Sequence, residues 1–166
     1  MIKDLSPRSC VEFAIATEET GARFYSQLAE RFSGNRELAV IFRQLGQDEE
    51  VHRDQFFDLL SHLPQEAGTS TAETSDYVRA MSMSEFFSRE KGPLSQIDSV
   101  KSRDDALGKV FGFEKATLGY YQAAKDIIGE NIALNQIIEA EKSHIARLMK
   151  LMITGAKFRS LQDVWP

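Results

Sequence analysis

The sequence contains little cysteine, proline or histidine. Its 166 residues include one cysteine (Cys10), four prolines and three histidines. A single cysteine excludes an internal disulfide and any metal site built on Cys-x-x-Cys pairs, as is typical of proteins in a reducing compartment. We therefore expect a cytoplasmic protein.

Long apolar runs are also missing. No stretch approaches the roughly 20 apolar residues that span a bilayer, and residues 1–7 lack the apolar segment of a signal peptide. Acidic residues outnumber basic ones by 25 to 20, for a net charge of −5. This balance gives no reason to expect nucleic acid or an anionic membrane as a partner. The length and the ordinary composition predict a single domain over residues 1–166.

Two of the three histidines follow a glutamate by three residues, in Glu49-x-x-His52 and Glu141-x-x-His144. On a helix this spacing places both side chains on one face, so both can reach one metal ion. Each motif also interrupts an apolar stripe at positions where core residues belong. An ionised carboxylate buried there needs a cation or must take up a proton. One motif alone would favour a core histidine hydrogen-bonded to a glutamate, but two in the same stripe position favour metal ligands.

Apolar periodicity predicts four helices, at about residues 6–32, 36–63, 103–128 and 131–153. Residues that favour helix termini lie at their ends: Ser6 with Pro7, Asn35, Ser102 with Asp105, Gly129 with Asn131, and Gly155. The connection over residues 64–102 contains a brief helical pattern near residues 77–87, and residues 156–166 form a C-terminal tail. A connection this long can run the length of a bundle, so we expect the second and third helices to be parallel.

An internal repeat relates the two halves of the chain. Glu18 and Tyr25 recur 96 residues later as Glu114 and Tyr121, and the two Glu-x-x-His motifs are 92 residues apart. Each half is thus a helical hairpin with one glutamate on its first helix and Glu-x-x-His on its second. If the halves meet at mid-bundle, four carboxylates and two imidazoles surround two metal ions. Four carboxylates balance the charge of two divalent ions, which suits a buried site.

The pattern Glu18, Glu49-x-x-His52, Glu114, Glu141-x-x-His144 resembles the ferritin-like di-iron carboxylate proteins and, within them, the rubrerythrin branch. The resemblance implies an all-α, ferritin-like four-helix bundle with a long crossover between helices two and three. It also implies two iron ions held by these six residues, with manganese or zinc as substitutes. The implied function is an oxidoreductase that reacts Fe(II) with O₂ or peroxide, as a rubrerythrin-like peroxidase or a ferroxidase. The alternative is a non-catalytic iron-binding or iron-handling protein.

Two departures from the rubrerythrin pattern bear on the function. Rubrerythrins proper carry a further glutamate three residues after the third-helix ligand, where this chain has Thr117. They also usually carry a rubredoxin-like domain with four cysteines, which one cysteine cannot supply. We therefore expect an external electron donor as a partner. We also expect the protein to be a homodimer.

Several roles stay open at this point. Tyr25 and Tyr121 lie two turns beyond the glutamates of their own helices, so they cannot bind the same ion. They could donate hydrogen bonds to carboxylates of neighbouring helices, they could be redox-active side chains, or they could be ordinary core tyrosines. Asp48 or Glu50, which flank Glu49, could orient His52. The sequence also does not decide which glutamates bridge the two ions and which bind only one.

Overall fold

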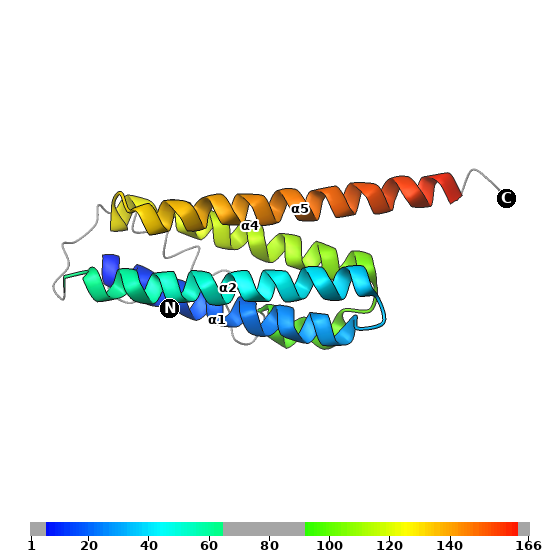
Figure 1. Cartoon of the computed structure of the whole chain (residues 1–166), viewed down its shortest axis with the longest axis horizontal. Helices are drawn as coiled ribbons and strands as arrows, with labels where there is room; N and C mark the ends of the chain where they lie inside the picture. The colour runs from blue at the N-terminus through cyan, green and yellow to red at the C-terminus, as the bar shows by residue number, and fades with distance from the viewer. Residues whose placement is uncertain (1–5, 65–91, 163–166) are drawn as a thin grey trace.

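The computed structural model describes residues 6–64 and 92–162, which are helical over most of their length (Figure 1). The chain forms helices α1 (Pro7–Arg31) and α2 (Arg36–His62), a short 3₁₀ helix η2 (Pro93–Ser99), then α4 (Arg103–Ile128) and α5 (Ile132–Gln162). These described residues contain no β-strand. The helix predicted near residues 77–87 lies outside them.

Capping residues explain where the helices begin. The side chain of Ser6 accepts a hydrogen bond from the Ser9 amide, and Pro7 occupies the first helical position of α1. Asn35 and Ser102 cap α2 and α4 in the same way, which satisfies amides that have no partner within the helix. The sequence predicted helix starts at all three capping residues. Gly129, with a φ of 87°, ends α4 in a backbone conformation that only glycine adopts without strain.

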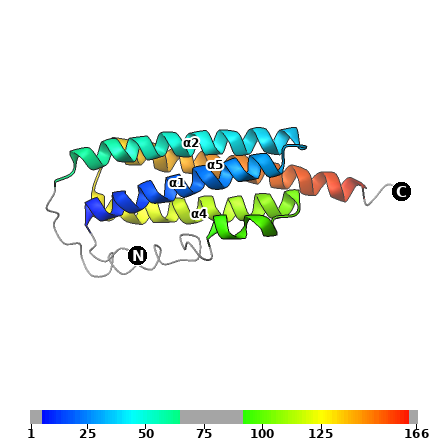
Figure 2. The ribbon, with the colours of Figure 1, turned by 90° about the horizontal axis from the view of Figure 1, so that it is seen from below.

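The four long helices form a bundle (Figures 1 and 2). Because short turns join α1 to α2 and α4 to α5, each pair is an antiparallel hairpin. The hairpins pack together through α1 against α4 and α2 against α5. Both views show α2 and α4 running in the same direction. This arrangement confirms the prediction of an all-α four-helix bundle with parallel second and third helices.

Helix α5 is longer than the sequence predicted. The prediction ended it near residue 153, with Gly155 as a terminator and a tail from residue 156, but the helix continues to Gln162. Figure 1 shows its C-terminal part extending beyond the ends of the other helices. A glycine inside a helix costs only about 1 kcal/mol relative to alanine, so Gly155 alone does not end α5.

The bundle has two apolar core clusters with a polar layer between them. Tyr121 and Phe56 belong to one cluster, and Phe24 and Phe113 to the other. Along every long helix, the chain leaves one cluster and enters the other across a buried glutamate. The buried charged groups therefore lie at mid-bundle, and the apolar clusters separate them from both ends.

The helices carry their apolar residues on inward-facing stripes. Within residues 6–64 and 92–162, no helix combines the length and the apolar character that crossing a membrane requires.

Helix α1 passes very close to this polar layer at Gly21. A Cβ atom placed there would lie 3.1 Å from Cε1 of Phe113 and 3.3 Å from Cγ and Cδ of Glu49. Both side chains are buried, so neither can move away freely. Gly21 thus allows α1 to approach the glutamate of α2 and the aromatic ring of α4.

We predict that Gly21→Ala will gain no stability, or will lose some, although alanine favours helix over glycine. The matched control is Gly108→Ala in α4, where a Cβ would meet no atom within 4 Å. The control should stabilise chelator-treated protein by about 0.5–1 kcal/mol, measured by urea unfolding. Equal stabilisation by the two substitutions would show that the contact at Gly21 has no effect.

Candidate metal centre

The structure brings together all six side chains that the sequence predicted as metal ligands. Each of the four long helices contributes at least one of them, and all are buried. They are Glu18 on α1, Glu49 and His52 on α2, Glu114 on α4, and Glu141 and His144 on α5.

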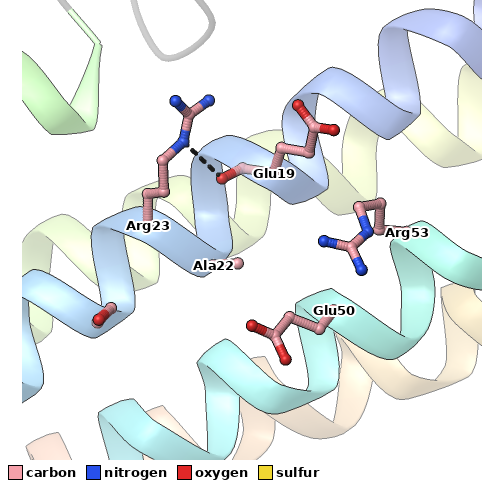
Figure 3. A pocket seen from close by; sticks show the side chains of 6 residues that line it. Glu19, Ala22, Arg23, Glu50 and Arg53 are labelled. Carbon is pink, nitrogen blue, oxygen red and sulfur yellow. Dashed lines mark hydrogen bonds between the residues drawn. The ribbon is translucent and has the colours of Figure 1, made fainter.

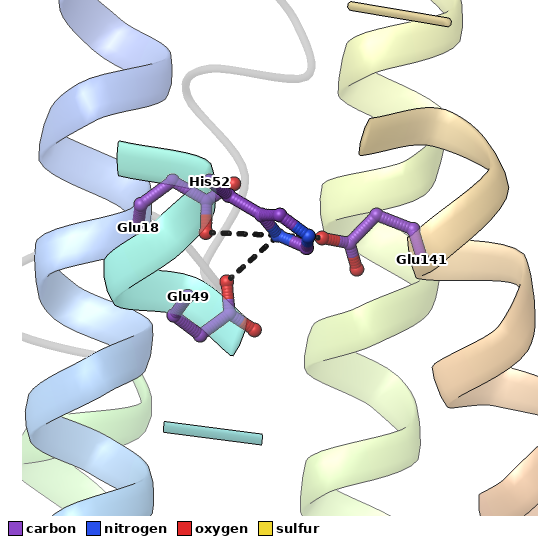
Figure 4. Close-up of side chains that lie close together, drawn as sticks. All are labelled: Glu18, Glu49, His52 and Glu141. Atoms are coloured by element: carbon purple, nitrogen blue, oxygen red, sulfur yellow. Dashed lines mark ion pairs between the residues drawn. The ribbon is translucent and has the colours of Figure 1, made fainter. Parts of the chain in front are cut away.

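These residues form two overlapping groups. In each group, one possible ligand atom from every residue lies within 4.8 Å of those of the other members. The first group is Glu18, Glu49, His52 and Glu141, and the second is Glu49, Glu114, Glu141 and His144. Figure 4 shows the first group converging from α1, α2 and α5. Glu49 and Glu141 belong to both groups, a distinction between the four glutamates that the sequence left open.

The two imidazoles face the carboxylates through the same ring nitrogen. Nδ1 of His52 lies 3.1 Å from Oε1 of Glu141, and Nδ1 of His144 lies 3.3 Å from Oε2 of Glu114. The two rings are nearly parallel, with centroids 5.7 Å apart and an interplanar angle of 28°. Each half of the repeat therefore presents one imidazole nitrogen to the centre.

Two buried tyrosines cross between the hairpins. The hydroxyl of Tyr25 on α1 donates a hydrogen bond to Oε1 of Glu114 on α4, and that of Tyr121 on α4 donates to Oε1 of Glu18 on α1. Both tyrosines are therefore donors to carboxylates on a neighbouring helix, which is one of the roles that the sequence left open. Each bond fixes one oxygen of its glutamate and leaves the other oxygen directed at the cluster.

Protons balance the charge of this cluster in the metal-free protein. Burial lowers the pKa of both imidazoles, but the surrounding carboxylates outweigh it. Glu141 and Glu49 raise the pKa of His52 to about 9, and Glu114 and Glu141 raise that of His144 to about 11. Both imidazoles are therefore cationic at neutral pH when no metal is bound.

The carboxylates divide into two kinds. Burial and the charge of Glu49 raise the pKa of Glu18 well above its usual value, and burial and the charge of Glu141 raise that of Glu114 to about 8. Burial and Glu49 also oppose the ionisation of Glu141. Its contacts with His144, His52 and Glu114 nevertheless outweigh them and lower its pKa. Glu141 thus carries the negative charge that the two imidazoles share.

The buried polar atoms of the cluster fit metal ions. Five of them have no hydrogen-bond partner: Glu18 Oε2, Glu49 Oε2, His52 Nδ1 and both oxygens of Glu141. Buried polar atoms nearly always form hydrogen bonds, so a group of atoms without them calls for an explanation. Carboxylate oxygens and imidazole nitrogens are good ligands for divalent transition metals. The donor set therefore fits two such ions.

The residues beside the ligands differ from the sequence prediction in one respect. Asp48 or Glu50 was expected to orient His52, but Oδ2 of Asp48 lies 3.1 Å from Nε2 of His144. This partner depends on how α2 packs against α5, which helical spacing within α2 cannot give. Gly21 was also missed, because its importance depends on the distance between helices.

Glu19 and Glu50 lie outside the cluster, although each directly follows one of its glutamates. They line an open pocket on the outer side of α1 and α2, together with Ala22, Arg23, Ser26 and Arg53 (Figure 3). Nε of Arg23 donates a hydrogen bond to the backbone oxygen of Glu19. Glu19 and Glu50 are exposed, so they serve as controls for substitutions of Glu18 and Glu49.

We predict that metal-free protein will lose stability as the pH rises from about 6 to about 9. The stabilisation from His52 and His144 is complete below pH 6.5, the unfolded pKa, and is lost as the pH rises through their folded values of about 9 and about 11. Glu114 acts in the same direction, because it ionises near 4.5 when unfolded but near 8 when folded. In all three cases the folded state binds more protons, so its free energy of unfolding falls with pH.

Thermal unfolding of chelator-treated protein at a series of pH values measures this loss of stability. The melting temperature should fall by roughly 2–4 °C for each kcal/mol lost. Protein loaded with a divalent metal should show a weaker dependence, because the metal replaces the protons. A melting temperature that rises with pH in the metal-free protein would contradict the assigned protonation states.

Comparisons with known proteins agree with this geometry. The family model described as Rubrerythrin matches residues 10–97, which is more than half of the chain. The fold is similar to that of a protein from Thermotoga maritima described as ferritin-like and di-iron-carboxylate. That match has a TM-score of 0.69 and 21% identity, and it covers 90% of this chain and 95% of the other. No curated protein matches the chain. The bundle has the ferritin-like fold, and the chain belongs to the rubrerythrin family.

Proposed function

We propose that the protein is a di-iron carboxylate oxidoreductase that reacts Fe(II) with O₂ or peroxide, as a peroxidase or a ferroxidase. The observation that carries the proposal is the pair of overlapping ligand groups that share Glu49 and Glu141. Two ions that share carboxylates are held close together, as two-metal chemistry requires. Membership of the rubrerythrin family favours iron for both positions, with manganese or zinc as substitutes.

In this proposal Glu18 and His52 would hold one ion, Glu114 and His144 would hold the other, and Glu49 and Glu141, which belong to both groups, would be available to either ion. Bound iron would supply the Fe(II)/Fe(III) couple that the reduction of O₂ or peroxide requires. The four carboxylates would neutralise two divalent ions, which lowers the cost of burying the charges.

The residues around the ligands would position them and limit water. Tyr25 and Tyr121 hold Glu114 and Glu18 by one oxygen each, which restricts how far either carboxylate can rotate. The two apolar clusters separate the centre from both ends of the bundle. A low-dielectric surrounding of this kind strengthens the interactions between ligands and ions.

Thr117 favours a second candidate, a non-catalytic iron-binding or iron-handling protein. Rubrerythrins proper place a further glutamate at this position. The Thr117 hydroxyl instead donates a hydrogen bond 3.0 Å long to the Phe113 carbonyl, so it is occupied within its own helix. A redox enzyme with this ligand set would depend on an external electron donor. We place it in the cytoplasm, where the buried thiol of Cys10 stays reduced.

Iron titration tests the proposal and separates the two candidates. We expect metal-free protein to bind two Fe(II) ions per chain under anaerobic conditions, with a higher melting temperature for the loaded protein. Addition of O₂ or peroxide should then oxidise both ions within seconds, followed by optical absorption. Slow oxidation at the rate of free Fe(II) would favour iron handling, and failure to bind two ions would overturn both candidates.

We predict that two Glu→Gln substitutions will have very different effects on the stability of metal-free protein. Glu18 has a raised pKa, so Glu18→Gln resembles its protonated form and should change stability by less than about 1 kcal/mol. Glu141→Gln removes the anion between two cationic imidazoles, and should cost roughly 3–5 kcal/mol, as does breaking a buried ion pair. Both substitutions should weaken Fe(II) binding.

Glu19→Gln is the matched control, one residue from Glu18 and exposed. It should leave both the urea midpoint and the Fe(II) affinity unchanged. If Glu19→Gln weakened Fe(II) binding as much as Glu18→Gln, the assignment of Glu18 to the inner face of α1 and Glu19 to its outer face would be wrong.

A further inference from the structure

The two halves of the centre differ in the residue that precedes each Glu-x-x-His motif. Nε2 of His144 lies 3.1 Å from Oδ2 of Asp48, while Nδ1 of the same ring faces Glu114 and Glu141. The repeat offset of 92 that relates the Glu-x-x-His motifs pairs Asp48 with Ala140. An alanine side chain has no hydrogen-bond acceptor, so among residues 6–64 and 92–162 His52 has no counterpart of this contact.

The ligands and the tyrosines that bond to them are matched between the halves. Each half supplies one glutamate from its first helix, and a tyrosine of the opposite half holds it. The shared residues Glu49 and Glu141 are themselves equivalent under the repeat. Both imidazoles are nearly fully buried and present Nδ1 to the cluster. Asp48 and Ala140 are a pair of equivalent positions whose difference bears directly on an imidazole ligand.

A carboxylate at Nε2 prepares an imidazole for a metal ion. It holds the proton of the neutral ring on Nε2, so the lone pair on Nδ1 points at the cluster, and it fixes the rotation of the ring. It also makes Nδ1 a stronger donor. Loss of such a partner typically costs about 10–100-fold in metal affinity. His144 has this partner, and His52 must adopt its binding tautomer and orientation without it.

We propose that the two metal positions are inequivalent, and that Asp48 is a positioning residue that makes the His144 position the tighter one. The ion held by Glu114 and His144 then binds first, and the ion held by Glu18 and His52 binds second and exchanges more readily. The inference rests on the proposed metal site, and adds the order in which its two positions fill.

Single-histidine variants allow the two positions to be compared directly. His52→Ala leaves the His144 position intact, and His144→Ala leaves the His52 position intact. We would titrate metal-free protein with Zn²⁺, which has no redox chemistry, by calorimetry at constant pH. The affinity of His52→Ala for its one ion should exceed that of His144→Ala by about 10–100-fold. Circular dichroism of each metal-free variant checks that the bundle is folded.

Asp48→Ala, added to each single-histidine variant, completes a double-mutant cycle. It should weaken Zn²⁺ binding about 10–100-fold in His52→Ala and leave His144→Ala unchanged. Asp48→Asn, whose amide oxygen still accepts a hydrogen bond, should restore part of the affinity. Asp48 is 43% exposed, so none of these changes leaves a buried cavity. Glu50→Ala is the exposed control, and should affect neither position.

Ala140→Asp tests the inference in the opposite direction. Under the repeat it places a carboxylate beside His52, so it should tighten Zn²⁺ binding in the His144→Ala background. Equal affinities of the two single-histidine variants, or an equal loss from Asp48→Ala in both, would overturn the inference and leave the proposed function standing. Failure of the wild-type protein to bind two ions would overturn the proposed function itself.

Discussion

Compensation of buried charge at mid-bundle is the constraint on which the rest of this structure depends. Four glutamates and two histidines lie in one layer between two apolar clusters, where unpaired charges would be prohibitively costly. Without metal, the cluster binds protons on its imidazoles and on two of its carboxylates. Two divalent ions would replace these protons and carry the same total positive charge. The same six residues therefore govern both the stability of the bundle and its capacity to bind metal.

The layer also determines how closely the helices pack. Gly21 lets α1 approach Glu49 and Phe113. One tyrosine from each hairpin also donates a hydrogen bond to a glutamate of the other hairpin. Neither hairpin contains a complete group of ligands, because each of the two overlapping groups draws on both. Packing of the hairpins and assembly of the centre are thus one event.

The sequence was sufficient to predict the fold and to identify the six residues that the structure brings together, because helical spacing and the repeat are both visible without knowledge of contacts between helices. Ser6, Asn35 and Ser102 were identified as caps for the same reason, since a cap bonds to its own helix. Features that depend on contacts between helices could not be predicted. The sharing of Glu49 and Glu141, the contact of Asp48 with His144 and the steric role of Gly21 all depend on the offset between neighbouring helices. The end of α5 was missed because one glycine is a weak terminator.

The crossed tyrosines have a consequence for the origin of the chain. Two identical hairpins in a symmetric dimer would form the same pair of bonds, each tyrosine reaching the glutamate of the other copy. Such a dimer must also carry the same residue beside both histidines, because every substitution occurs in both copies. Joining the two copies in one polypeptide removes that restriction, and an aspartate can then stand opposite an alanine. The difference between residues 48 and 140 is thus one that a symmetric dimer of identical hairpins cannot carry.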